Sequence, residues 1–345
     1  HSGIYYKPGS YKARNCIVGY KKLISFAEKH SVPFEITGKL IVANDQNEIE
    51  TLLKIYQYGV ENGLEGIKLI DSPEIQKIEP FCTNAIKAIH VPQSGIIDYL
   101  KLGEKLLQLL KENDADIRFN TKVLSIKNGD NLASINLSNE KIVCKRIIMC
   151  NGVFSDKFIS KDLKNEIRVF PFRGEYYKLI PDARHKVKGL IYPVPNLNFP
   201  FLGLHFTKTI HGDIEAGPNA VLALSREGYD KTSFNFTDFF EIISWKGFWV
   251  FTFKYWRIGF YEMYRSFFKK AFMNSLKTLI PAIKENELIP KSAGIRAQVL
   301  TYNGELFDDF LIDNNKRIVN VINAPSPAAT SCFAIAEQIL NRIDE

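Results

Sequence analysis

Residues 317–331 read RIVNVINAPSPAATS, and this stretch decides the fold class that we predict. Its first half is typical of a buried strand, and CFAIAEQILNRI after it is typical of an amphipathic helix. Small residues at such a turn let a ligand approach the backbone, and the unpaired N–H groups of a helix N-terminus can bind an anion. An ordinary strand-to-helix turn with a Ser or Thr cap has the same composition, so both interpretations stay open here.

A second run of the same kind ends at residues 146–152, RIIMCNG. Its near-continuous apolar character is typical of a fully buried strand of a parallel sheet. Such a strand would bring Cys150, Asn151 and Gly152 close to a ligand beyond the strand ends, although Asn-Gly also suits a plain tight turn. Successive strands are predicted over 117–150 from IRFN, TKVLSIKN, LASINLS and KIVCKRIIMC, the last of which contains this run.

Working outward, the ends of the chain are mixed α/β and the middle is rich in strands. Apolar spacing and capping residues predict helices over 11–30, 44–62, 72–79 and 97–113 and a strand over 38–43. Residues 169–225 have the alternation and the Pro and Gly turns of an antiparallel sheet. The 345 residues suffice for two domains, and the pattern suits a discontinuous α/β domain with an antiparallel domain inserted into it.

Composition excludes several classes of protein. The five cysteines form no CxxC pair, which argues against a disulfide framework and a structural zinc site, so we expect no metal. The net charge of +7 comes from dispersed Lys and Arg, which disfavours nucleic-acid binding. That excess suits a small acidic substrate, an anionic cofactor or an anionic membrane surface.

Polar residues between apolar neighbours mark a candidate substrate site. Arg173 in FRGEYY, Tyr192 in IYPVP and His205 in LGLHF could converge on one cavity of the antiparallel sheet, and Arg296 in SAGIRA could clamp a carboxylate. A histidine base suits proton abstraction from a hydroxyl at neutral pH. The alternatives are surface arginines and a structural histidine.

The segment 234–272 is dense in Phe, Trp and Tyr and is interrupted by Lys and Arg. It is therefore not an uninterrupted transmembrane span. Aromatic residues beside cations suit a helix that lies at a membrane surface. Ordinary core packing of the aromatic rings is the alternative interpretation.

No Gly-x-Gly-x-x-Gly fingerprint, P-loop or nucleophile elbow occurs in the chain. Several stretches together, in order along the whole chain, nevertheless resemble the L-2-hydroxyglutarate oxidase/dehydrogenase family, within the D-amino-acid-oxidase-like group of FAD enzymes. The matching stretches are HSGIYYKPGS with KAR (1–14), GKLIVA (38–43), GIIDY (95–99), FRGEYY (172–177), IYPVP (191–195), FPFLGLHFT (199–207), GPNAVLALSREGY (217–229), AGIRAQ (293–298) and NAPSPAATS (323–331).

The resemblance implies a three-layer FAD-binding domain and an inserted antiparallel domain that covers the flavin and binds the substrate. We assign 1–35, 96–168 and 291–345 to the first, and 36–95 and 169–290 to the second. In the family a strand, a glycine loop, a helix and a ribose-binding acidic residue precede the HSG segment. That N-terminal unit is absent from the sequence, and we expect it before His1 in the full protein.

The resemblance also implies site residues. It places next to FAD the following set: His1, Ser2, Gly3, Val123, Cys150, Asn151, Gly152, Arg296, Pro327, Ala328, Ala329 and Thr330. Of these, Val123 and residues 150–152 would lie near the adenosine, and residues 327–330 near the flavin ring. On the substrate side we expect Arg173, Tyr192 and Arg296 to bind a small dicarboxylate. His205 and Arg296 are then the catalytic candidates, with His205 as the base.

The implied reaction is oxidation of L-2-hydroxyglutarate to 2-oxoglutarate, with electrons passed to oxygen or to a membrane quinone. We expect a cytoplasmic protein, peripheral on the inner membrane if the aromatic segment docks there. Two alternatives stay open: a related FAD enzyme that acts on amines or glycerol 3-phosphate, and an inactive fragment that serves only as a binding module.

Overall fold

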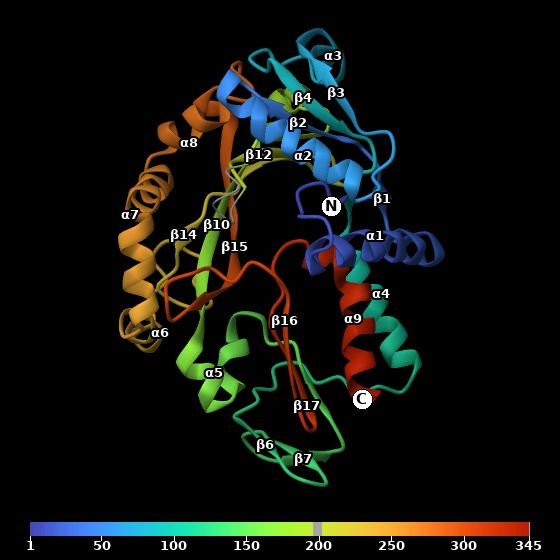
Figure 1. The fold of residues 1–345 in the computed structure, drawn as a ribbon, viewed down its shortest axis with the longest axis vertical. Helices are drawn as coiled ribbons and strands as arrows, with labels where there is room; N and C mark the ends of the chain where they lie inside the picture. Colours follow the sequence, from blue (N-terminus) through green and yellow to red (C-terminus); the bar gives the residue numbers. More distant parts are fainter. Residues whose placement is uncertain (196–201, 345) are drawn as a thin grey trace.

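A large, mostly antiparallel sheet dominates the upper part of the computed structural model, which describes residues 1–195 and 202–344 (Figure 1). In the described residues it has nine strands in the order β14-β10-β13-β12-β11-β2-β4-β3, with β15 on the other edge of β10. Their bounds are β2 Lys39–Ala43, β3 Lys68–Asp71, β4 Lys87–Val91, β10 Ile167–Leu179, β11 Leu190–Pro193, β12 His205–Lys208, β13 Ile214–Gly217, β14 Val221–Leu222 and β15 Leu288–Thr301. The predicted antiparallel middle of the chain is thus confirmed.

The long pair β10–β15 forms the spine of this sheet. It runs in register from Ile167 opposite Thr301 to Leu179 opposite Leu288, with an irregularity between Gly174 and Tyr176. A bulge of this kind changes which side chains face each side of the sheet. Phe172, before the bulge, packs in an apolar cluster with Phe251, whereas Tyr177, after it, packs on Phe272.

Helices cover this sheet on its outer side (Figure 1). The aromatic-rich segment 234–272, for which a helix at a membrane surface was one interpretation, folds into three helices, of which the long central one has non-helical backbone angles at Tyr255. No helix of the described residues is both long and apolar enough to cross a membrane. The helices around the sheet are α2 Ile49–Glu61, α3 Ser72–Ile78, α6 Phe236–Ile243, α7 Lys246–Phe267 and α8 Lys269–Leu276.

The lower part holds two small three-stranded sheets beside a group of helices (Figure 1). One sheet has the order β16-β17-β9, with β9 parallel to β17, and the other the order β6-β7-β8. The elements are α1 Tyr11–His30, α4 Tyr99–Glu112, α5 Lys161–Glu166, α9 Ala328–Asp344, β6 Ser125–Asn128, β7 Ala133–Asn136, β8 Lys141–Cys144, β9 Ile147–Met149, β16 Leu311–Asn315 and β17 Ile318–Asn323; a short pair, β1 Phe34–Glu35 and β5 Ile96–Ile97, joins the two parts.

The strand-turn-helix predicted from residues 317–331 is present as β17 followed by α9. Helix α9 packs closely on α1, whose predicted bounds, 11–30, are confirmed. At the crossing, a Cβ atom on Gly19 would lie 2.5 Å from the Cα of Ser331 and 2.9 Å from the carbonyl oxygen of Thr330. Only a glycine lets the two backbones approach this closely.

Two expectations for residues 117–150 are wrong. IRFN is not a strand, since residues 117–120 form no ladder and Asn120 has a left-handed φ of 53°. The last run splits into β8 and β9, which belong to different sheets, and β9 is not fully buried because Ile148 is 47% exposed. Ile147 and Met149 pack under β6–β8, while the face that carries Ile148 is uncovered in the described residues.

A buried ion cluster ties the two parts together. Arg226 pairs bidentately with Asp156, with N–O distances of 2.8 and 3.0 Å, and also contacts Glu241 of α6 at 3.2 Å. Both Arg226 and Asp156 are less than a tenth exposed. Charge-assisted bidentate pairs of this kind fix geometry as well as charge.

Of the matching stretch 199–207, residues 199–201 lie outside the described residues.

Candidate active site

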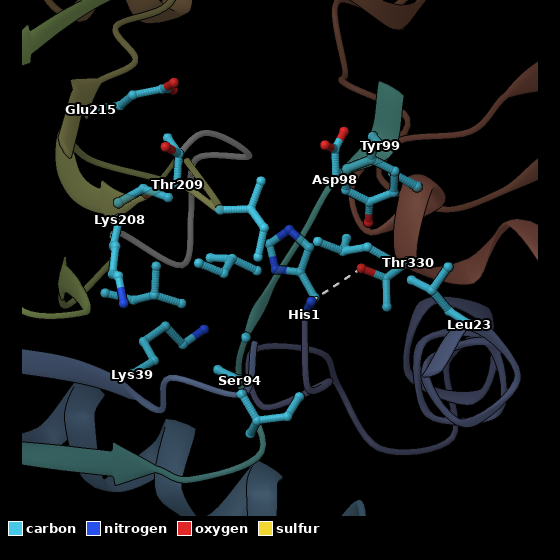
Figure 2. A pocket seen from close by; sticks show the side chains of 18 of the residues that line it. His1, Leu23, Lys39, Ser94, Asp98, Tyr99, Lys208, Thr209, Glu215 and Thr330 are labelled. Carbon is cyan, nitrogen blue, oxygen red and sulfur yellow. Dashed lines mark hydrogen bonds between the residues drawn. The ribbon is translucent and has the colours of Figure 1, made fainter. Parts of the chain in front are cut away.

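A cavity of about 580 Å³ lies between the large sheet and the α1–α9 pair (Figure 2). Residues from both ends and the middle of the chain line it, including His1, Lys39, Ser94, Tyr192 and Thr330. Its size is in the range of small-molecule sites, and sites of this kind commonly lie between domains. Tertiary structure thus gathers at one place stretches that are more than 300 residues apart in the chain.

The start of α9, predicted from the sequence as a ligand-facing turn, forms one wall of the cavity. Ala329 and Thr330 line it, and Thr330 Oγ1 accepts a hydrogen bond from the backbone nitrogen of His1 at 3.1 Å. The His1 ring lies in the middle of the view in Figure 2, with Nε2 3.3 Å from the hydroxyl of Ser326. The first turn of a helix offers N–H groups without intrahelical partners, which suits an anionic or carbonyl-bearing ligand.

Tyr192 and His205 form a stacked pair on the sheet side. Their ring centroids are 3.9 Å apart, and His205 Nδ1 lies 2.9 Å from the carbonyl oxygen of Gly203. Because a carbonyl only accepts, Nδ1 carries the proton and Nε2 keeps its lone pair. Burial, followed by the positive charges of Arg296 and Lys39, lowers the pKa of His205 to about 3, so the ring is neutral at physiological pH.

Arg296 reaches the same group of side chains. It hydrogen bonds the hydroxyl of Tyr176, and its charge also acts on Tyr192 and His205. Burial raises the pKa of Tyr192 to about 12, despite a hydrogen bond with Thr207. The structure therefore brings Arg296, Tyr192 and His205 together, as the sequence analysis expected.

Arg173 is not brought to the cavity. Its Nε lies 3.1 Å from Glu175 Oε1, and its Nη1 donates to the carbonyl oxygen of Asp230 at 3.0 Å. Glu175 in turn accepts hydrogen bonds from Asn219 and Ser266. Arg173 is 6% exposed, so it is a buried, neutralised cation. Arg173 and Glu175 are two residues apart in FRGEYY, and this spacing was the sequence signal for the ion pair.

Neither His205 nor Arg296 is among the residues that line the cavity, and the remaining candidates do not line it either. Ser2 is buried 3.5 Å from the hydroxyl of Ser94, and Gly3 has a left-handed φ of 98°. Cys150, Asn151 and Gly152 follow the end of β9, where Cys150 is exposed. Val123 is 36% exposed and precedes β6. These last four residues do not line the main cavity.

Lys39, which the sequence analysis missed, is the buried cation of the cavity. It is the first residue of β2 and is 4% exposed. Its Nζ lies 4.5 Å from the ring centroid of Tyr5 and 4.9 Å from that of Tyr192. Burial lowers the pKa of Lys39 to about 7. A lysine that opens the otherwise apolar strand KLIVA was the available signal.

Comparisons with known proteins identify relatives of this chain. The family model described as FAD dependent oxidoreductase matches residues 1–342. The chain is 45% identical over 337 residues to the L-2-hydroxyglutarate dehydrogenase of Indibacter alkaliphilus, covering 97% of this chain and 84% of the relative. It is 38% identical over 363 residues to the mitochondrial L-2-hydroxyglutarate dehydrogenase of Homo sapiens, covering 100% and 78%.

Solved structures share the fold. The L-alpha-glycerophosphate oxidase of Mycoplasma pneumoniae, with FAD bound, superposes with a TM-score of 0.78 at 21% identity and covers 100% of this chain and 83% of that one. The glycine oxidase of Bacillus cereus superposes with a TM-score of 0.66 at 16% identity, covering 96% and 84%. At these identities the likeness concerns the fold alone.

Proposed function

The chain belongs to the FAD dependent oxidoreductase family, and we propose that it is a dehydrogenase that oxidises L-2-hydroxyglutarate to 2-oxoglutarate. The observation that carries this proposal is the 45% identity to an L-2-hydroxyglutarate dehydrogenase over 97% of the chain. The cavity supports it physically, because two cations, Lys39 and Arg296, act on the same small region next to a neutral histidine. A substrate with two carboxylates needs two such positive groups.

The residues present fit the flavin-ring end of FAD. The cavity is large enough for a ring system and a small acid, and Ala328 and Ala329 leave the backbone at the start of α9 open to a ligand. Ala329 and Thr330, in the first turn of α9, line the cavity itself. In our proposal His1, Ser2, Gly3, Arg296 and residues 327–330 hold this end of the cofactor.

The adenosine end of the cofactor would lie at the β16-β17-β9 sheet. We propose that Val123 and residues 150–152 border it. Strand β9 has a free edge in the described residues, and its Ile148 face is uncovered. We also keep the proposed division into an FAD-binding domain (1–35, 96–168, 291–345) and a substrate domain (36–95, 169–290).

When bound, FAD supplies the acceptor for the hydride that leaves C2 of the hydroxy acid. The protein must hold the substrate and take the hydroxyl proton. We propose that Arg296 and Tyr192 orient the carboxylate next to C2 and that His205 Nε2 accepts the proton. Burial is the main cause of the low pKa of His205, followed by the charges of Arg296 and Lys39. Carboxylates bound at these two cations would offset the contribution of the charges and so raise the pKa of His205 in the complex.

The test of this function is flavin reduction without oxygen. Full-length protein reconstituted with FAD is mixed anaerobically with L-2-hydroxyglutarate, and the absorbance of oxidised flavin is followed. We expect rapid bleaching with the L isomer and none with D-2-hydroxyglutarate, glycerol 3-phosphate or glycine. Bleaching by one of the last two alone would assign the alternative substrates. A protein that cannot be reconstituted with flavin would support a binding module instead.

We further propose that α7 docks on an anionic membrane surface. Phe253 is 76% exposed, and Phe260 and Phe267 are both 68% exposed. Lys254 and Arg257 are interleaved with them and supply the matching positive charge. Apolar and cationic side chains on one surface helix are typical of interfacial binding. Docking would bring the enzyme to a membrane quinone as electron acceptor, with oxygen as the alternative.

Vesicle sedimentation tests this docking. We expect the protein to pellet with vesicles that contain phosphatidylglycerol and not with pure phosphatidylcholine. The double variant Phe253→Ser, Phe260→Ser should stay in the supernatant. The matched control is Phe119→Ser, since Phe119 is also exposed, at 69%, but lies outside α7. Equal pelleting of the double variant and the control would refute docking through α7.

A further inference from the structure

Lys39 is a buried cation without an acidic partner. Its ammonium forms no ion pair with any carboxylate among the described residues, and its residue is only 4% exposed. The two other lysines that line the cavity on the sheet side are paired: Lys208 lies 2.8 Å from Glu35, and Lys291 is paired with Glu215. Figure 2 shows Lys39 directed into the cavity, toward the side where His1 lies.

Such an arrangement is costly unless a ligand completes it. Removing an ammonium group from water is unfavourable when no counter-charge compensates it. The rings of Tyr5 and Tyr192, with centroids 4.5 and 4.9 Å from Nζ, offer a partial cation–π contact. This contact leaves N–H donors for an acceptor inside the cavity, and a carboxylate would supply both the charge and the hydrogen bonds.

The position of the second cation indicates which carboxylate this is. Lys39 Nζ lies 4.9 Å from the ring centroid of Tyr192, and Tyr192 in turn stacks on His205 with ring centroids 3.9 Å apart. If His205 receives the proton of the C2 hydroxyl, the carboxylate next to C2 belongs with Arg296. The carboxylate at the other end of a five-carbon dicarboxylate then falls to Lys39, the buried cation that lines the cavity.

We therefore propose that Lys39 binds the C5 carboxylate of the substrate and makes the site specific for dicarboxylic over monocarboxylic 2-hydroxy acids. This inference rests on the proposed function for the identity of the substrate. It assigns to Lys39 a contact with the substrate end that does not react. Lys39 therefore contributes to selectivity and affinity rather than to the proton transfer.

The first experiment compares two substrates that differ at that end. Full-length, FAD-loaded wild type, Lys39→Met and Lys39→Arg are assayed with L-2-hydroxyglutarate and with L-2-hydroxybutyrate, which lacks the C5 carboxylate. A lost charge-assisted hydrogen bond corresponds to a drop of about 10- to 150-fold in kcat/KM for L-2-hydroxyglutarate. For L-2-hydroxybutyrate we expect a change of less than about threefold. Lys39→Arg should recover part of the loss.

Equal losses with both substrates would overturn the proposal, because Lys39 would then serve the reacting end or the flavin. An unchanged kcat/KM for L-2-hydroxyglutarate in Lys39→Met would overturn it as well. Flavin content and the melting temperature of each variant show whether the protein is folded. Lys39→Met removes a buried charge without adding volume and should not be less stable than wild type.

A second measurement does not depend on turnover. Calorimetric titration with glutarate, in buffers of different ionisation enthalpy at pH 8, counts the protons taken up on binding. The pKa of Lys39 is about 7 in the free protein, and a bound carboxylate raises it, so the wild type should take up a proton at pH 8. Lys39→Arg should bind glutarate without this uptake, since arginine stays charged.

The two proposals can fail separately. If L-2-hydroxyglutarate does not reduce the flavin but glutarate binds with Lys39-dependent proton uptake, the proposed function fails and the dicarboxylate site stands. If the flavin is reduced but proton uptake is unchanged in Lys39→Arg, the Lys39 proposal fails and the proposed function stands. Glutarate binding that is equally tight in wild type and Lys39→Met refutes the Lys39 site outright.

Discussion

Substituting Gly19 by alanine tests the contact that positions α9 at the cavity. The added Cβ would lie 2.5 Å from the Cα and 3.1 Å from the carbonyl carbon of Ser331. These are backbone atoms of a helix, so they cannot rotate away as a side chain can. Helices α1 and α9 must separate, and the start of α9 must then move relative to the cavity that Ala329 and Thr330 line.

The magnitude follows from a matched pair of variants. Gly103 lies in α4 and is exposed, and a Cβ there meets nothing within 4 Å. Both substitutions gain about 1 kcal/mol of helix propensity. Only Gly19→Ala incurs the strain of an overpacked contact, which costs about 1–3 kcal/mol. We therefore expect the free energy of unfolding of Gly19→Ala to be lower than that of Gly103→Ala by about 1–3 kcal/mol.

Urea unfolding with saturating FAD, followed by tryptophan fluorescence, measures this difference from the midpoints if the slopes agree. Retention of FAD on a desalting column reports the displacement of α9 directly, and we expect Gly19→Ala to lose more flavin than Gly103→Ala. Equal midpoints and equal flavin content in the two variants would refute the reasoning. The helices would then have enough freedom to accept a methyl group between them.

Three further predictions concern charged and titrating groups. Arg296→Met should lower kcat/KM for L-2-hydroxyglutarate by at least about 10- to 150-fold, and wild-type rates would exclude a clamp. His205→Gln should lower kcat by about 10²- to 10⁴-fold. The unfolded chain binds a proton at His205 near pH 6.5, whereas the folded protein does so only near pH 3; wild type should therefore lose stability as pH falls below 6.5, and His205→Gln should lose less over the same range. Arg226→Met leaves Asp156 buried without its counter-charge, which should reduce the free energy of unfolding by about 3–5 kcal/mol. Lys316→Ala, at an exposed ion pair, should leave the urea midpoint nearly unchanged.

Local patterns in the sequence predicted much of the framework correctly. The 3.6-residue spacing of apolar side chains over 11–30, with Ser10 as cap, correctly predicted α1 and both of its ends. RIVNVIN followed by the Pro-Ser-Pro segment gave β17 and α9. These elements are stabilised largely by contacts between neighbours in the chain, so their signal is present in a short window. The strand prediction for IRFN failed because, within the described residues, no partner strand pairs with it.

The sequence by itself determined the family, through short stretches kept in order along the whole chain, and the types of the main elements. Tertiary structure alone decided which charges are neutralised. Arg173 looked equivalent to Arg296, yet a buried ion pair with Glu175 takes it out of the cavity. Lys39 looked like the polar start of a strand, yet the fold buries it beside Tyr192 without an ion pair to any carboxylate of the described residues. Neutralisation depends on groups brought together from distant parts of the chain, and no local pattern of residues contains that information.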